Sequence, residues 1–217
     1  MTIIKIFFWL LLFIIFYTYV GYGILLFLIV KFRRITGLYK KREPDNGYEP
    51  DVTLFIAAYN EKDFVAEKIR NSLELDYPTE KLHIMWVTDG SDDGTPEELN
   101  KYKGIMVYHL PERNGKIGAM NRGMKFVTTP VVVFCDANTL LGKESVRRIV
   151  KLFSDPKVGC VSGEKRILSQ EKDSAAGSGE RHYWKYESAL KKLDSERYSV
   201  VGAAGELFAI RTELYRE

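Results

Sequence analysis

The feature that most constrains the fold of this chain is an uncharged stretch of 25 residues at positions 6–30. At about 1.5 Å per residue, a helix of this length measures roughly 37 Å, enough to span a ~30 Å hydrocarbon core. A signal peptide has a shorter apolar region and a cleavage site of small residues, whereas this stretch ends in Phe-Leu-Ile-Val. A buried core helix would rarely be apolar on every face. The sequence therefore predicts one transmembrane helix, within an anchor over residues 1–34.

Charge on either side of this helix predicts its orientation. Residues 31–42 hold six basic side chains and no acid, while only Lys5 and the amino terminus are positive before the helix. Because cytoplasmic flanks are enriched in Lys and Arg, we expect an inner or plasma membrane location with the amino terminus outside and the rest cytosolic. The net charge of +3 leaves a slightly acidic body. A nucleic-acid-binding domain would spread its basic residues over the folded part, so no nucleic acid partner is expected.

Beyond a polar linker at residues 35–50, apolar runs alternate with stretches of helical spacing up to residue 217. Strands are expected at residues 51–58, 82–87, 105–110, 130–135 and 158–162. Helices are expected at residues 61–75, 95–102, 117–127, 143–153 and 180–193, with a polar loop at residues 170–179. This alternation predicts an α/β domain over residues 51–217, with a mostly parallel sheet and helices on both faces. Ligands bind such sheets at the carboxyl ends of the strands.

Polar clusters follow four of the predicted strands. They are AAYNE at residues 57–61, TDGSDDGT at 88–95, RNGK at 113–116 and DAN at 136–138. For any one cluster, a turn or a helix cap explains the residues equally well, because Asp and Ser cap helices and Gly forms turns. Turns do not require acids, a lysine and an amide together at one edge of a sheet. We therefore interpret the four clusters together as a ligand site.

In order, the segments AAYNE, VTDGSDDGT, RNGKIGAMNRG, FCDANT and VVGAAGELFAIRTELY resemble the bacterial family 2 glycosyltransferases. The resemblance covers residues 52–217. Within the family, the chain looks most like the membrane-bound synthases related to hyaluronan, cellulose and poly-N-acetylglucosamine synthases. It implies the GT-A fold, a nucleotide-binding α/β sheet, preceded here by one transmembrane helix. It also implies transfer from a nucleotide sugar, usually UDP-linked, to a saccharide or lipid acceptor with inversion. The product would be a cell-surface polysaccharide or glycan.

The resemblance assigns the donor nucleotide to the first two clusters. It places Ala58, Tyr59 and Glu61 in the substrate-binding segment, where main-chain groups of residues 57–59 would line the base and ribose. Asp89 would accept the N–H of a uracil ring, and we expect its carboxylate to be exposed and outside the core. The alternative for Asp89 is a cap of the helix at residues 95–102.

The resemblance also implies a divalent cation, Mg²⁺ or Mn²⁺, because the diphosphate leaving group gains charge as the glycosidic bond breaks. Asp136 and Asn138 hold the family's Asp-x-Asp positions, and both offer the oxygen ligands that hard cations prefer. Asn replaces the second acid, which should weaken the affinity for the metal. Lys116 is suited to a phosphate, with a solvated lysine as the alternative.

Three further residues complete the expected substrate site. Arg113, like Lys116, is assigned to a phosphate. Asn121 is a further candidate, with a position on the helix surface as its alternative. Gly205 matches a segment that lines the acceptor side, with a tight strand turn as the alternative. An inverting transfer needs a general base. In the family this base follows the segment matched by residues 202–215, so we expect it beyond Glu217 and predict that this C-terminally incomplete domain binds the donor but transfers poorly.

Three other hypotheses compete with a catalytic domain. The first is a non-catalytic, membrane-anchored module that binds nucleotide sugars and needs a second chain to complete the active site. The second is a dinucleotide-dependent oxidoreductase, which is disfavoured because AAYNE, and no Gly-rich fingerprint, follows the first strand. The third is a P-loop protein, which is disfavoured because Ile117 stands where Mg²⁺ binding needs Ser or Thr.

Overall fold

The computed structural model describes residues 2–38, 43–164, 175–200 and 202–217, with the side chains of the last helix described from Tyr183 onward. The chain forms two compact units. One comprises Met1–Arg42 and Arg166–Gly202, and the other comprises Glu43–Lys165 and Ala203–Glu217. The second unit contains the sheet and all of the sequence-predicted site residues.

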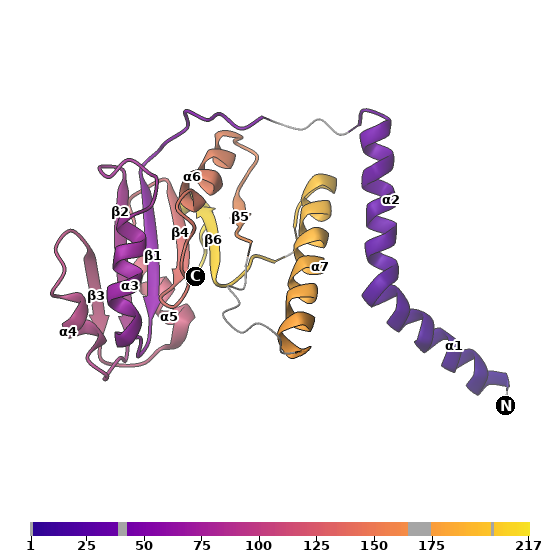
Figure 1. Ribbon diagram of the computed structural model, residues 1–217, viewed down its shortest axis with the longest axis horizontal. Helices are drawn as coiled ribbons and strands as arrows, with labels where there is room; N and C mark the ends of the chain where they lie inside the picture. Colours follow the sequence, from indigo (N-terminus) through magenta and orange to yellow (C-terminus); the bar gives the residue numbers. More distant parts are fainter. Residues whose placement is uncertain (1, 39–42, 165–174, 201) are drawn as a thin grey trace. The chain divides into compact units, whose positions relative to one another are not determined.

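The sheet has six strands in the order β3-β2-β1-β4-β6-β5 (Figure 1). These are β1 (Val52–Ala58), β2 (Leu82–Asp89), β3 (Met106–Leu110), β4 (Val131–Asp136), β5 (Cys160–Ser162) and β6 (Leu207–Arg211). Strands β1 to β4 run parallel, β6 is antiparallel to β4, and β5 is antiparallel to β6. Five strands lie where the apolar runs predict them. Strand β6 is absent from the sequence-based expectation, and it separates β4 from β5.

Helices cover both faces of the sheet because the strands are apolar on both sides. The helices of this unit are α3 (Lys62–Leu73), α4 (Thr95–Leu99), α5 (Gly115–Met124) and α6 (Ser145–Val150), with 3₁₀ turns η2 (Lys151–Ser154) and η3 (Thr212–Leu214). One core joins α3 and α6 to alternate strand residues such as Leu54, and the other joins α5 to the residues between them, such as Phe55. The predicted α/β fold, with a mostly parallel sheet between two helical layers, is confirmed.

Helix α5 lies very close to the sheet because Gly123 has no side chain. A Cβ atom at Gly123 would lie 2.4 Å from the ring of Phe55 and 2.7 Å from Val87. Any larger residue would push the helix away from the strands. This contact fixes the helix whose first turn carries the predicted phosphate-binding lysine.

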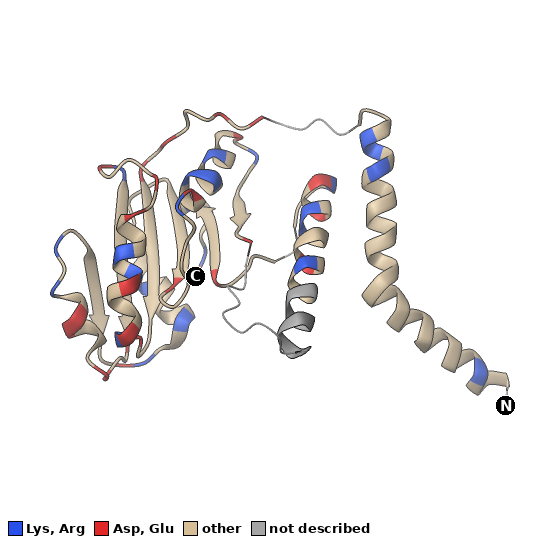
Figure 2. Ribbon diagram, in the orientation of Figure 1, with Lys and Arg blue, Asp and Glu red and all other residues tan. Residues whose placement is uncertain are grey.

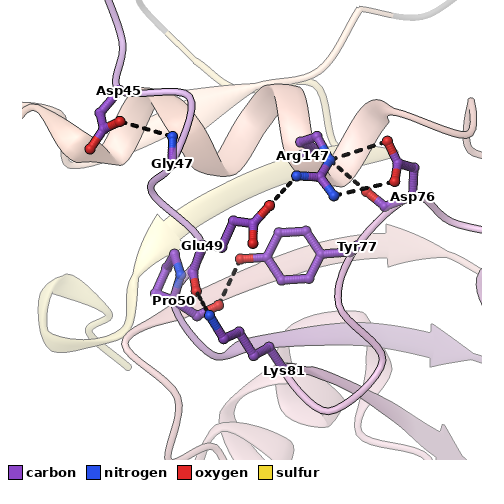
Figure 3. A network of polar contacts seen from close by, with 8 residues as sticks. All are labelled: Asp45, Gly47, Glu49, Pro50, Asp76, Tyr77, Lys81 and Arg147. Carbon is purple, nitrogen blue, oxygen red and sulfur yellow. Dashed lines mark hydrogen bonds and ion pairs between the residues drawn. The ribbon is translucent and has the colours of Figure 1, made fainter.

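A polar network holds the chain at the amino ends of the strands (Figure 3). The guanidinium of Arg147 pairs with Glu49, and its Nε lies 3.1 Å from Oδ2 of Asp76. The hydroxyl of Tyr77 donates a 2.6 Å hydrogen bond to the carbonyl of Pro50. These bonds anchor the final residues of the predicted linker at the sheet edge opposite the candidate site.

The other unit contains one long amino-terminal helix. It consists of α1 (Thr2–Phe16), a π-helical turn η1 (Tyr17–Gly21) and α2 (Tyr22–Ile35). Its charged residues lie near its two ends, and the stretch between them is uncharged (Figure 2). By its length of 34 residues and its hydropathy, the helix could cross a membrane.

Helix α7 (Ala175–Arg197) packs against α2 within this unit. The hydroxyl of Tyr22 donates to Asp194 at 2.6 Å, and Arg34 pairs with Glu196. Helix α7 begins earlier than the sequence predicts, so residues 175–179 of the expected loop are helical. The rest of that loop, residues 170–174, lies outside the described residues.

Candidate functional site

The carboxyl ends of the parallel strands bring the predicted polar clusters to one edge of the sheet. In the strand register, Ala57 of β1 lies beside Asp136 of β4, and Ala58 lies beside Thr88 of β2. Strand order reverses between β1 and β4, because β2 and β3 continue to one side and β4 begins the other. At such a switch point the connecting loops diverge and leave a crevice for a ligand. Ala58 itself is buried at this edge.

Lys116, Asp136 and Gly205 meet beside this switch point. Nζ of Lys116, in the first turn of α5, donates to Oδ1 of Asp136 at 2.5 Å and to the main-chain carbonyl of Gly205 at 3.0 Å. The side chains of Lys116 and Asp136 are 46% and 29% exposed, so a ligand can reach both. Together with Ala57 and side chains of the core, the three residues line a gap that is too small to hold a water molecule. The structure thus brings together three of the sequence-predicted site residues.

Glu61 and Asn138 form a second polar pair at the same edge. Nδ2 of Asn138 donates to Oε1 of Glu61 at 3.3 Å. The pKa of Glu61 is raised, first by burial and then by the negative charges of Asp136 and Asp93. Burial and the nearby acidic groups therefore disfavour the ionised form of Glu61, and the acidic groups favour a cation at this edge of the sheet.

This raised pKa gives a test of the site's electrostatics. In the folded protein, Glu61 holds its proton more tightly than in the unfolded chain, so its contribution to stability is greatest below its unfolded pKa. That contribution falls as the pH rises through the folded pKa. We expect Glu61→Gln to raise the melting temperature at pH 7 and to leave it unchanged near pH 4. Thermal melts at both pH values measure this difference, and a variant less stable than the wild type at pH 7 would contradict the electrostatic account.

Tyr59 and Arg113 stack on each other across the loops that follow β1 and β3. The guanidinium of Arg113 lies 3.8 Å from the centroid of the Tyr59 ring, which is 40% exposed. Gly90 lies against Arg113 with a φ angle of +71°, and a Cβ there would come within 2.7 Å of the arginine. Two predicted binding residues thus form one stacked pair, and Gly90 allows the close approach of Arg113.

Asp89 is not exposed, and that expectation is wrong. Its side chain is 4% accessible, its Oδ1 accepts a hydrogen bond from Arg122 at 3.0 Å, and its Oδ2 accepts the N–H of Asn114 at 2.6 Å. Arg122 also donates to the carbonyl of Thr88 at 2.7 Å. The sequence analysis did not identify Arg122, because an arginine in a helix is normally expected to be exposed to solvent. The only signal was its position on the same helix as Lys116.

Asn121 lies apart from the Lys116–Asp136 pair. Its Oδ1 accepts a 2.6 Å hydrogen bond from the hydroxyl of Tyr215, whose ring packs against the α5 side of the core. Tyr215 follows β6, the strand that the sequence pattern did not reveal. Because the position of β6 was unknown, this partner of Asn121 could not be predicted.

Comparison with known proteins places the chain in a family. The family model described as glycosyl transferase family 2 matches residues 53–217. The chain belongs to glycosyltransferase family 2. The resemblance inferred from the sequence is thereby confirmed.

Two curated relatives of this family 2 chain are synthases. It is 34% identical over 123 residues to a poly-β-1,6-N-acetyl-D-glucosamine synthase of Staphylococcus aureus, over 55% of the chain and 29% of the relative. It is 28% identical over 171 residues to a β-monoglucosyldiacylglycerol synthase of Trichormus variabilis, over 74% of the chain and 35% of the relative. The chain thus spans about a third of the length of these relatives.

Two solved structures share the fold of this family 2 domain. A mannosyltransferase from Pyrobaculum calidifontis, in complex with GDP-Man and Mn²⁺, has a TM-score of 0.70 and 28% identity, over 89% of this chain and 54% of its own. Staphylococcus aureus TarS, residues 1–349 in complex with UDP, has a TM-score of 0.50 and 18% identity, over 58% of this chain and 38% of its own. The second likeness supports the fold alone.

The residues of the family 2 domain fit a divalent cation in their chemistry. Asp136, Asn138 and Glu61 offer carboxylate and amide oxygens. The pKa of Glu61 is raised mainly by its burial and further by the negative charges of Asp136 and Asp93, which would favour a cation nearby. Within the described residues, no group of three or more His, Cys, Asp or Glu side chains is arranged as a ready metal site. The donor set therefore suits a metal that arrives with a phosphate ligand of its own.

Proposed function

We propose that this chain carries the donor site of a membrane-anchored glycosyltransferase, which moves a sugar from a nucleotide sugar to an acceptor hydroxyl with inversion. The observation that carries the proposal is the meeting of Lys116, Asp136 and Gly205 at the switch point of the sheet. Membership of family 2 supports the reaction class. The basic residues after the amino-terminal helix support a cytosolic site with the amino terminus outside.

In this proposal each group of residues binds one part of the donor. The base and ribose lie against the main chain at Ala58 and the exposed face of Tyr59, and we favour a UDP-linked donor. The ammonium of Lys116 leaves the carboxylate of Asp136 and binds the diphosphate. Asp136 and Asn138, with Glu61 beside them, would hold Mg²⁺ or Mn²⁺. When bound, the cation supplies charge neutralisation for the leaving diphosphate.

The acceptor is proposed to approach past Gly205, where the main chain is open. A Cβ atom added at this glycine would meet nothing within 4 Å beyond its chain neighbours, so a sugar ring can come close to the backbone. The curated relatives include one polysaccharide synthase and one glycolipid synthase, which supports a saccharide or a lipid as the acceptor class.

Binding measurements on the full chain in lipid nanodiscs test this function. We expect UDP-N-acetylglucosamine or UDP-glucose to bind in the presence of Mn²⁺, and EDTA to weaken that binding. Binding of GDP-mannose alone would overturn the choice of UDP and leave the reaction class intact. Absence of binding for every nucleotide sugar tried, with the protein folded, would contradict the proposal as a whole. If a nucleotide sugar binds, transfer of labelled sugar to an acceptor would identify a catalytic domain rather than a binding module that needs a second chain.

The Asn138→Asp variant tests the metal assignment specifically. It restores the second acid next to Asp136, so we expect Mn²⁺ to support nucleotide binding at about tenfold lower concentration than in the wild type. Titration of Mn²⁺ at fixed nucleotide measures the half-saturating concentration. An unchanged value in the variant would show that residue 138 does not contact the cation.

A further inference from the structure

A buried lysine lies behind the loop that carries Asp136 and Asn138. Lys68, on helix α3, is 0% exposed. Its Nζ donates to Sγ of Cys135 at 2.9 Å and to the main-chain carbonyl of Thr139. Burying an ammonium group is energetically unfavourable, whereas methionine would fill similar space without that cost. The charge at this position therefore indicates a role beyond packing.

Asn71 contacts the same loop from the same helix. It lies three residues after Lys68, so the two side chains project from one face of α3. Its Nδ2 donates to the carbonyl of Leu141 at 2.8 Å, and its Oδ1 accepts the N–H of Leu141 at 2.8 Å. Both hydrogen bonds join the side chain of Asn71 to the main chain, so the loop's path past Leu141 is fixed by α3.

We infer that Lys68 and Asn71 are positioning residues that hold the loop at residues 136–141 in the shape needed to bind a cation. Cys135 immediately precedes Asp136, and Thr139 immediately follows Asn138. Lys68 thus forms hydrogen bonds on both sides of the segment that carries the two proposed metal ligands. The loop adds one bond of its own, from the N–H of Thr139 to the carbonyl of Asp136 at 3.2 Å.

The inference rests on the proposed function for its purpose, but the hold on the loop can be measured without any ligand. Supporting residues of metal ligands typically change metal affinity by about 10- to 100-fold when they are replaced. We therefore expect Lys68→Met and Asn71→Leu each to raise the Mn²⁺ concentration needed for nucleotide binding by about tenfold or more. Nucleotide binding in EDTA should change less than about twofold.

The experiment uses the full chain in nanodiscs with two measurements on each variant. The first is the Mn²⁺ titration at fixed UDP-N-acetylglucosamine, and the second is amide hydrogen exchange of residues 136–141 without ligand. Both variants should exchange faster than the wild type in this loop, because its anchoring bonds are gone. Ser72→Ala is the matched control. Ser72 is equally buried on α3, but among the described residues its hydroxyl bonds only to the carbonyl of Lys68 in its own helix, at 2.8 Å.

The outcomes separate this inference from the proposed function. Loop exchange like that of the wild type in folded Lys68→Met and Asn71→Leu would overturn the inference, as would an unchanged Mn²⁺ requirement. If Lys68→Met does not fold, Asn71→Leu alone decides. If the wild type binds no nucleotide at all, the proposed function fails, and the exchange measurement still shows whether α3 holds the loop.

Discussion

Replacing Asp89 with alanine is expected to destabilise the protein by about 3 kcal/mol, because it leaves the guanidinium of Arg122 partly buried without its partner. Asp89 is almost fully enclosed and accepts hydrogen bonds from Arg122 and from the main-chain N–H of Asn114. The side chain of Arg122 is 22% exposed, so water compensates for part of the loss. Urea denaturation of the Asp89→Ala variant measures the change in the free energy of unfolding.

The double variant Asp89→Ala with Arg122→Met is the control for this first prediction. Removing both charges eliminates the uncompensated cation, so the double variant should be more stable than Asp89→Ala alone. If the double variant loses as much stability as the single variants Asp89→Ala and Arg122→Met added together, the ion pair is not the cause. Nucleotide binding by the variant, measured at a temperature where it remains folded, tests separately whether Asp89 also contacts the base.

Replacing Asp136 with asparagine is expected to weaken Mn²⁺-dependent binding of the nucleotide sugar by about 100-fold. The substitution keeps the size of the side chain and removes the one carboxylate that ends a strand beside Lys116. Stability should change little, because the Lys116–Asp136 pair is partly exposed and such pairs contribute about 0–1 kcal/mol. Calorimetry with Mn²⁺ and with EDTA gives both affinities, and a thermal melt gives the stability.

Asp51→Asn is the matched control for Asp136→Asn. Asp51 is an exposed carboxylate whose Oδ1 lies 3.6 Å from Nε2 of His83. It comes just before β1 and therefore lies at the opposite edge of the sheet. This variant should bind the nucleotide sugar like the wild type in both conditions. Equal losses from the two substitutions would indicate a general effect of charge, and an unaffected Asp136→Asn would remove Asp136 from the site.

The sequence by itself determined the first five strands along the chain and the edge of the sheet at which the predicted site residues lie. Apolar runs such as residues 51–58 and 82–87 indicate burial, because a strand covered on both faces is apolar at nearly every position. The polar clusters follow those runs, and parallel strands end at one edge. The sequence therefore predicted that Lys116 and Asp136 lie at the same edge of the sheet, but it did not predict their 2.5 Å hydrogen bond.

Only the tertiary structure decided which polar side chains are buried and what holds them. Asp89 and Arg122 are 33 residues apart, and Lys68 and Cys135 are 67 residues apart. Periodicity along a chain describes one element at a time and carries no information on such pairs. The same reason hid β6, whose apolar run could be placed between β4 and β5 only by the packing of the sheet. From the sequence, Asp89 was therefore expected to be an exposed ligand, although it is a buried partner of Arg122. Lys68 likewise carried no sign of its burial.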